Sequence, residues 1–205
     1  DILAGDCRLD QALVKDKRQP NLALLPAAQN RSKESITPEQ MTELVAKLSA
    51  AGYHFVLIDC PAGIEGGFRN AIAAAKEAVI VTTPEISAVR DADRVIGLLE
   101  ANDIKAKRLI INRLKPAMVQ EDLMMSVQDV QDILAVPLLG VVPDDERVIV
   151  STNKGEPLVL EKKLSLAGVA FSNIARRFLG EKVPFLDLAA PHDDLFSRFR
   201  RMFRG

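Results

Sequence analysis

The fold of this chain is decided by the stretch FVLIDCPAGIEGG at residues 55–67. Its first four residues are apolar without alternation, which is typical of a strand buried on both faces of a parallel sheet. Asp59 follows at the carboxyl end of this predicted strand, and Gly63 lies in the glycine-rich loop after it. Because ligands of open α/β sheets bind beyond the carboxyl ends of the strands, the stretch places Asp59 at a candidate binding crevice.

Two kinds of role are open for Asp59. The carboxylate can hold a magnesium ion, often through water, or orient an attacking water toward a phosphate. The glycines after it, Gly63 among them, allow the close approach and the change of backbone conformation that a phosphate-sensing loop needs. The alternative is structural: Asp59 caps the helix that follows. The stretch alone leaves both roles open.

The rest of the sequence alternates between apolar runs and amphipathic stretches. Apolar runs at 78–84, 108–113 and 138–142 predict further buried strands. Apolar residues at helical spacing predict helices between them, with clear start signals at Thr37, Ser126 and Ser165. This alternation indicates βαβ units, so the sequence predicts an α/β fold with a doubly wound, mostly parallel sheet.

Length and composition limit the class of protein. A chain of 205 residues fits one domain with a short appendage, and a formal net charge of -1 argues against general attraction to nucleic acid. Cys7 and Cys60 form no metal-binding spacing, which favours a reducing compartment. No apolar run approaches the roughly 20 residues of a membrane-spanning helix. The chain opens without Met and with no strand before its first predicted helix, so we expect the protein to begin upstream of Asp1.

Two later predicted strands also end in polar residues. The run at 108–113 ends in Asn112 and Arg113, and the run at 138–142 is followed by Pro143, Asp144 and Asp145. Because the carboxyl ends of parallel strands meet at one edge of a sheet, these residues can line the same crevice as Asp59. An Asn side chain offers both a donor and an acceptor, which suits the edge of an adenine ring.

A mixed cluster of charges lies on the helix predicted to begin near Ser87. The apolar face of this helix is interleaved with Arg90, Asp91, Asp93 and Arg94. A solvated helix face explains such a cluster, and a surface for a protein partner is the alternative.

The chain ends in a predicted amphipathic helix. We expect a domain at 1–180, a linker at 181–191, where Pro, Asp and small residues gather, and the helix at 192–205. At about 100° per residue, one arc of roughly 120° holds the apolar residues; they are Leu195, Phe196, Phe199, Met202 and Phe203. The remaining surface holds Arg198, Arg200, Arg201 and Arg204. Docking on its own domain is one explanation, but it does not explain why every charge from Arg198 onward is positive, whereas an anionic lipid surface does.

Together these features resemble the ParA/MinD family of deviant P-loop ATPases, over essentially the whole chain. The most specific pieces are DCPAGIE at 59–65, TPE at 83–85, SAVRDADR at 87–94 and GVVPDD at 140–145. NKGEP at 153–157 and the terminal helix complete the match. The run PFLDL at 184–188 is similar to cyanobacterial or plastid members.

The resemblance implies a role for each group of residues. Asp59 would lie near magnesium and the catalytic water, and Gly63 in the same switch loop. The polar residues at the two later strand ends would surround the adenine of ATP. The helix at 87–99 would belong to a surface that ATP-dependent homodimer formation creates for a MinC-like division inhibitor and a MinE-like regulator. The terminal helix would target an anionic membrane.

The function implied is an ATP-switched ATPase that places the division septum. It would be cytoplasmic, or stromal in a plastid, and peripheral on the inner face of the membrane. The 205 residues contain no G-x-x-x-x-G-K-[ST]. The resemblance places this phosphate loop and the switch I acid upstream of Asp1, so we expect the chain alone to be inactive as an ATPase. The absent first strand would leave a gap beside the run at 55–58.

Two alternatives stay open. A DNA-partitioning ATPase of the same fold would need a basic surface for phosphates. A non-enzymatic membrane scaffold would need no phosphate loop at all. The sequence upstream of Asp1 distinguishes the scaffold from the enzyme.

Overall fold

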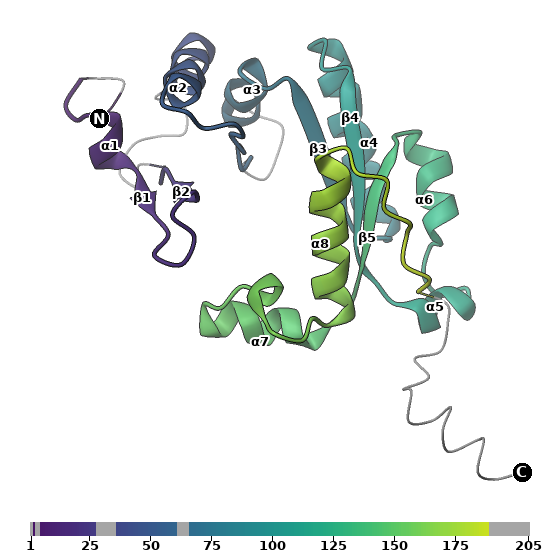
Figure 1. Cartoon of the computed structure of the whole chain (residues 1–205). Helices are drawn as coiled ribbons and strands as arrows, with labels where there is room; N and C mark the ends of the chain where they lie inside the picture. The colour runs from purple at the N-terminus through teal and green to yellow at the C-terminus, as the bar shows by residue number, and fades with distance from the viewer. Residues whose placement is uncertain (1, 3–4, 28–35, 61–65, 189–205) are drawn as a thin grey trace, which may run out of the picture. The chain divides into compact units, whose positions relative to one another are not determined.

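The computed structural model describes residue 2 and residues 5–27, 36–60 and 66–188. The chain forms two compact units, one of Asp1–Glu77 with Asn102–Ile104 and one of Ala78–Ala101 with Lys105–Gly205. The elements of both units are labelled in Figure 1. The predicted terminal helix lies outside the described residues.

The first unit is built of short elements and two longer helices. A small hairpin pairs two antiparallel strands, with Val14 opposite Leu24. The elements are α1 (Leu9–Ala12), β1 (Val14–Lys15), β2 (Ala23–Leu24), α2 (Pro38–Ala50) and α3 (Gly66–Ala73). Helices α2 and α3 contact each other, and the side-chain amide of Asn70 donates to the carbonyl of Ile36. That bond ties α3 to the segment before α2.

Helix α2 begins and ends as its sequence predicts. The hydroxyl of Thr37 accepts from the backbone N–H of Gln40 at 3.3 Å, and the Gln40 side chain accepts from the N–H of Thr37 at 3.0 Å. These two bonds form a capping box, so the predicted helix start at Thr37 is confirmed. After the helix, Gly52 has a φ of 92°, the left-handed conformation that glycine adopts without strain.

The predicted buried strand at 55–58 is wrong for this structure. Residues 55–60 carry no strand assignment, and Leu57 is 84% exposed and Phe55 57% exposed. An apolar run becomes a buried strand only where neighbouring strands complete its hydrogen bonds and helices cover both faces. The described sheet of the second unit is built from other segments.

The second unit contains the main sheet. Its strands are β3 (Glu77–Thr82), β4 (Ala106–Leu114) and β5 (Leu138–Pro143), in the order β3-β4-β5. Strands β4 and β5 are parallel, with Leu109 opposite Leu138 and Leu114 opposite Pro143. Helix α4 (Ile86–Ala101) connects β3 to β4, and α5 (Pro116–Gln120) with α6 (Val127–Leu134) connects β4 to β5. The predicted α/β class with βαβ units is confirmed.

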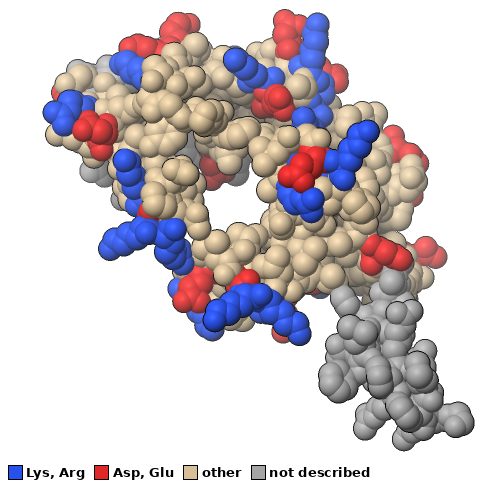
Figure 2. All heavy atoms as spheres, viewed as in Figure 1, with Lys and Arg blue, Asp and Glu red and all other residues tan. Residues whose placement is uncertain are grey.

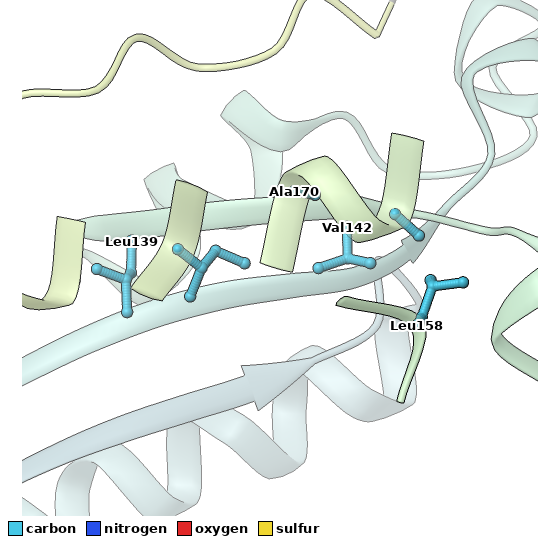
Figure 3. Close-up of a cluster of buried hydrophobic side chains, with 6 residues drawn as sticks. Leu139, Val142, Leu158 and Ala170 are labelled. Atoms are coloured by element: carbon cyan, nitrogen blue, oxygen red, sulfur yellow. The ribbon is translucent and has the colours of Figure 1, made fainter. Parts of the chain in front are cut away.

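Helices cover both faces of this sheet. Helix α8 (Leu166–Phe178) packs on β5. Helices α4 and α6 contact each other; in Figure 1, α4 lies behind the strands and α6 to the right of β5. Figure 3 shows the core beneath α8; its buried members are Leu139, Val142, Leu158, Ala167, Ala170 and Ile174. Ile110 packs against this cluster. Its neighbours Leu109 and Ile111 are fully buried and point to the opposite face, because side chains alternate along a strand.

Strand β3 is covered on one face only. Ile80 and Thr82 are buried, whereas Val79 and Val81 are 39% and 60% exposed. The prediction that this strand is buried therefore holds for one of its faces, in keeping with the place of β3 at the end of the described strand order.

The remaining elements follow β5. They are α7 (Glu146–Lys154), the 3-10 helix η1 (Leu158–Leu160) and α8. Ser165 caps α8 by accepting from the N–H of Gly168 at 3.3 Å. Gly180, with a φ of 91°, follows the end of α8. Residues 181–188, predicted as the start of a linker, lie against the domain, and Leu186 packs on the core beneath α8.

Gly140 provides a test of this packing. A Cβ at this position of β5 would lie 2.3 Å from Cγ1 of Ile174 on α8. Overpacking of this kind typically costs about 1–3 kcal/mol, so Gly140→Ala is expected to lower the free energy of unfolding by that amount in urea titrations. Gly97, on the exposed side of α4, has no atom within 4 Å of such a Cβ. Gly97→Ala is the matched control and should raise stability by roughly 0.5–1 kcal/mol. Equal effects would contradict the contact between α8 and β5.

Candidate functional site

The carboxyl ends of β4 and β5 meet at one edge of the second unit. Their parallel register places Leu114 opposite Pro143, and the N–H of Asp144 donates to the carbonyl of Leu114 at 2.9 Å. The structure therefore brings together the two groups of polar residues predicted at the strand ends.

Asn112 and Arg113 shape this edge through the backbone. The side-chain oxygen of Asn112, a half-buried residue, accepts from the N–H of Arg113 at 3.0 Å. Arg113 has a φ of 59°, which is uncommon for a residue with a side chain. Such conformations cluster where a binding site fixes the backbone. The Asn112 amide nitrogen remains a donor that can meet a heterocycle at this edge.

Asp144 joins two cations here. Its carboxylate lies 3.5 Å from Nε of Arg113 and 3.4 Å from Nζ of Lys115. These side chains are 67% and 48% exposed, so the pairs add little to stability. Both cations are exposed, so their remaining N–H groups can also donate to an electron-rich ligand at this edge. Lys115 was not predicted as a site residue, although it directly follows β4.

Asp145 has a structural role that its sequence motif did not reveal. Its carboxylate accepts from the N–H of Arg147 at 2.9 Å and so caps α7. Ser165 and the backbone of Ala167, where α8 begins, also act on this carboxylate and lower its pKa. Burial raises the pKa of Asp145, but these interactions outweigh it and hold the pKa below its usual value. Asp145 thus fixes two helix starts beside the site, and the buried Pro143 ends β5.

This role predicts a pH-dependent stability. A carboxylate whose pKa is lower in the folded state stabilises the fold above its unfolded pKa, and that stability is lost as pH falls through the folded pKa. Asp145→Asn keeps a side-chain oxygen that can cap α7 but removes the charge. Since hydrogen bonds to charged groups are stronger than neutral ones by about 1 kcal/mol, we expect a cost of that size near neutral pH. The difference from the unaltered chain should shrink in acid below about pH 4, near the unfolded pKa. Urea titrations over a pH series measure it. A constant difference would contradict the ionised role.

Asp59 belongs to the first unit and is exposed at the end of the run 55–60. Helix α3 is described from Gly66 onward, and residues 61–65 before it lie outside the described residues, so both roles stay open for Asp59. Gly63 lies outside the described residues. Burial raises the pKa of the neighbouring Cys60 thiol, and the charge of Asp59 raises it further. A raised pKa disfavours the thiolate, which is the reactive form of cysteine.

The described residues offer few side chains that could bind magnesium directly. In the described parts of the chain, no three His, Cys, Asp or Glu side chains gather into a metal-binding group. Magnesium usually takes one or two carboxylates and completes its shell with water and substrate phosphates. The exposed carboxylate of Asp59 fits that kind of site and does not fit an all-protein cage.

The charged cluster on α4 faces solvent. Arg90, Asp91, Asp93 and Arg94 are all exposed, and Nη1 of Arg94 lies 3.6 Å from Oδ1 of Asp91. The opposite side of α4 is buried through Val89, Ala92, Ile96 and Leu99. The cluster is accessible to a partner, and its exposure fits a solvated face equally well.

The predicted membrane residues, from Leu195 to Arg204, lie outside the described residues. Of the helices that the structure does describe, none is both long enough and apolar enough to cross a membrane.

The fold and the strand-end site match a known class of protein. A ParA family model, described as NUBPL iron-transfer P-loop NTPase, matches residues 33–179. The second unit, with its parallel sheet and its polar strand ends, is therefore part of a P-loop NTPase fold of the ParA type.

Individual relatives narrow the class. A septum site-determining protein MinD from Synechocystis sp. is 63% identical over all of this chain, which covers 77% of the relative. A solved MinC:MinD cell division complex from Aquifex aeolicus is 43% identical with a TM-score of 0.82, over 90% of this chain and 73% of that one. A septum site-determining MinD complexed with Mg-ADP from Pyrococcus horikoshii is 30% identical with a TM-score of 0.70, over 89% and 75%. The chain belongs to the MinD family.

Proposed function

We propose that this chain acts in an ATP-switched, membrane-associated ATPase that places the division septum. The observation that carries the proposal is the 63% identity over the whole chain to a septum site-determining protein. The strand-end site and the sequence of the terminal segment supply the physical means. A DNA-partitioning role has no comparable support, because the charge balance is close to neutral.

The adenine of ATP would bind at the ends of β4 and β5. Asn112 can donate to the ring, and Arg113 and Lys115, held by Asp144 at 3.5 and 3.4 Å, can lie along it. The fixed backbone at Arg113 and the helix starts held by Asp145 keep this edge in place. The Mg-ADP complex of the Pyrococcus horikoshii relative supports a nucleotide as the ligand.

Asp59 would act at the phosphate end. Its exposed carboxylate can accept a hydrogen bond from the attacking water and orient it. The same oxygens can hold water that belongs to the shell of magnesium, which supplies charge neutralisation on the phosphates when bound. The 205 residues lack the lysine-bearing phosphate loop, so we propose that they need that loop for hydrolysis.

Two surfaces would connect the nucleotide state to the division site. The exposed charges of α4 would contact a MinC-like inhibitor and a MinE-like regulator; the MinC complex of the Aquifex aeolicus relative supports the first. The terminal segment would bind anionic lipid on the inner face of a cytoplasmic or plastid membrane. One short helix binds weakly, but two helices in an ATP-bound homodimer gain affinity from effective concentration.

Vesicle binding tests the switch. The chain is joined to the part of the Synechocystis relative that it does not cover, and is sedimented with vesicles of phosphatidylcholine and phosphatidylglycerol. We expect ATP to tighten binding by at least about a hundredfold over ADP, as two linked sites do. Equal binding with either nucleotide would contradict the switch, and no binding with either would contradict the membrane role. The 205-residue chain is the control and should not respond to ATP.

A further inference from the structure

An apolar groove opens in the second unit beside α5 and α6. Its volume is about 570 Å³, within the range of pockets that hold ligands. Its walls include Leu114, Val119, Val127, Leu138 and Val141. The polar side chains that line it are few, namely Gln120, Gln131, Asn173, Arg177 and Asp187. A surface of this kind favours apolar side chains over a polar ligand.

One wall of the groove comes from the chain's own residues 183–188, here called the strap. Arg177 at the end of α8 holds the strap in place. Its Nε donates to the carbonyl of Val183 at 2.8 Å and its Nη2 to that of Pro184 at 2.7 Å, while Nη1 donates to Leu139 of β5 at 3.0 Å. The guanidinium also stacks over the ring of Phe185 at 4.2 Å. A planar guanidinium that bonds two segments at once fixes the strap to the sheet.

The strap leads directly to the terminal segment. Leu186 and Leu188 line the groove, and the undescribed part of the chain begins at residue 189. Leu195 comes seven positions after Leu188, so covalent geometry keeps this first residue of the apolar arc within about 25 Å of the groove. At this effective concentration even a weak intramolecular contact is populated.

The charges of the two segments are complementary. Residues 116–134, which form α5, α6 and the turn between them, contain four acids and no Lys or Arg; the acids are Glu121, Asp122, Asp129 and Asp132. Figure 2 shows acidic side chains over α5. Residues 195–205 contain four arginines and no acid. These acids do not line the groove itself, but they lie on the helices that flank it, so the arginines that favour anionic lipid are also attracted to these helices.

We propose that residues 193–204 dock with their apolar face in this groove and leave it to bind the membrane. The inference rests on the proposed membrane function, because it concerns the same segment. Apolar residues that are buried in the groove cannot enter a bilayer, so docking competes with vesicle binding. If four molecules in five are docked, the apparent vesicle affinity falls about fivefold.

A tryptophan reporter tests docking directly. The chain contains no Trp, so Phe199→Trp gives a single fluorophore within the apolar arc. Without vesicles, we expect its emission to be shifted to the blue relative to a peptide of residues 189–205 with the same change. Val127→Lys, in the groove wall, should shift the emission back to the red. Ile133→Lys is the matched control, because Ile133 lies on the same helix, is 53% exposed and does not line the groove.

Vesicle affinity gives the second readout. Both lysine variants add one positive charge, so attraction to anionic vesicles changes equally. Val127→Lys should bind vesicles of phosphatidylcholine and phosphatidylglycerol about three- to tenfold more tightly than Ile133→Lys, as expected when a competing state is removed. If Val127→Lys lowers the urea midpoint, the exposed changes Glu121→Lys and Asp122→Lys test the same contact through the emission of the Phe199→Trp reporter without vesicles, which they should shift to the red.

The outcomes separate docking from the membrane function. Emission identical to that of the free peptide, together with normal vesicle binding, would overturn docking and leave the membrane role intact. A blue-shifted emission that vesicles do not change, with no sedimentation, would keep docking and contradict the membrane role. Equal vesicle affinities for Val127→Lys and Ile133→Lys would also overturn the competition.

Discussion

Replacement of Phe199 by Glu is expected to abolish binding of the chain to anionic vesicles. Phe199 lies at the centre of the predicted apolar arc, flanked by Phe196 and Met202 one turn away on either side. Each such side chain contributes roughly 1.5–3 kcal/mol when it is fully buried in an apolar phase. Ordering a short helix opposes this gain, since such a helix is marginal in water. A carboxylate in the middle of the arc therefore removes the net affinity.

Sedimentation with vesicles of increasing phosphatidylglycerol content measures this loss. Phe199→Leu is the matched control and should bind nearly as well, because it keeps the arc apolar. Arg200→Glu should weaken binding and reduce its salt dependence, since each arginine near an anionic surface adds about 1 kcal/mol. A different result, in which Phe199→Glu unfolds the domain while sedimentation is unchanged, would show that this helix is a permanent part of the core.

Local signals in the sequence predicted most of the second unit. The capping box of Ser126 is present, with its hydroxyl accepting from Asp129 at 3.1 Å, and the apolar periods place β4, α6, β5 and α8 close to their observed bounds. These features depend on residues within one turn or one strand. The sequence is therefore sufficient where the deciding contacts are local.

The errors concern contacts that a local pattern does not contain. The run at 55–58 has the composition of a buried strand, yet burial depends on neighbours, and Leu57 is 84% exposed. Asp145 lies within a motif expected to bind nucleotide, but its interaction with Ser165 joins segments twenty residues apart in the sequence. Arg177 resembles an ordinary cation at a helix end. Only the fold shows that it bonds to Leu139 and to the strap.

Replacement of Asp59 by Ala is expected to lower ATP hydrolysis by on the order of a hundredfold or more, as loss of a positioned group at the reacting phosphate does. The measurement uses the chain joined to the uncovered part of the Synechocystis relative, and the 205-residue chain alone serves as the blank. Because Asp59 is exposed, its removal should change the free energy of unfolding by less than about 0.5 kcal/mol; a cap on the following helix would instead cost about 1 kcal/mol.

Asp144→Ala is the matched control for this carboxylate. Asp144 lies at the proposed adenine end, where it pairs with Arg113 and Lys115, so its loss should raise KM for ATP by a few-fold and leave kcat nearly unchanged. Asp59→Ala should show the opposite pattern, with a low kcat and a KM close to that of the same joined protein without the substitution. The reason is that an interaction made only in the transition state does not contribute to binding of the substrate in its ground state. Near-normal turnover in Asp59→Ala, in a protein shown by urea titration to be folded, would end the catalytic role of Asp59. A large loss of ATP binding would instead place this carboxylate among the groups that hold the substrate in its ground state.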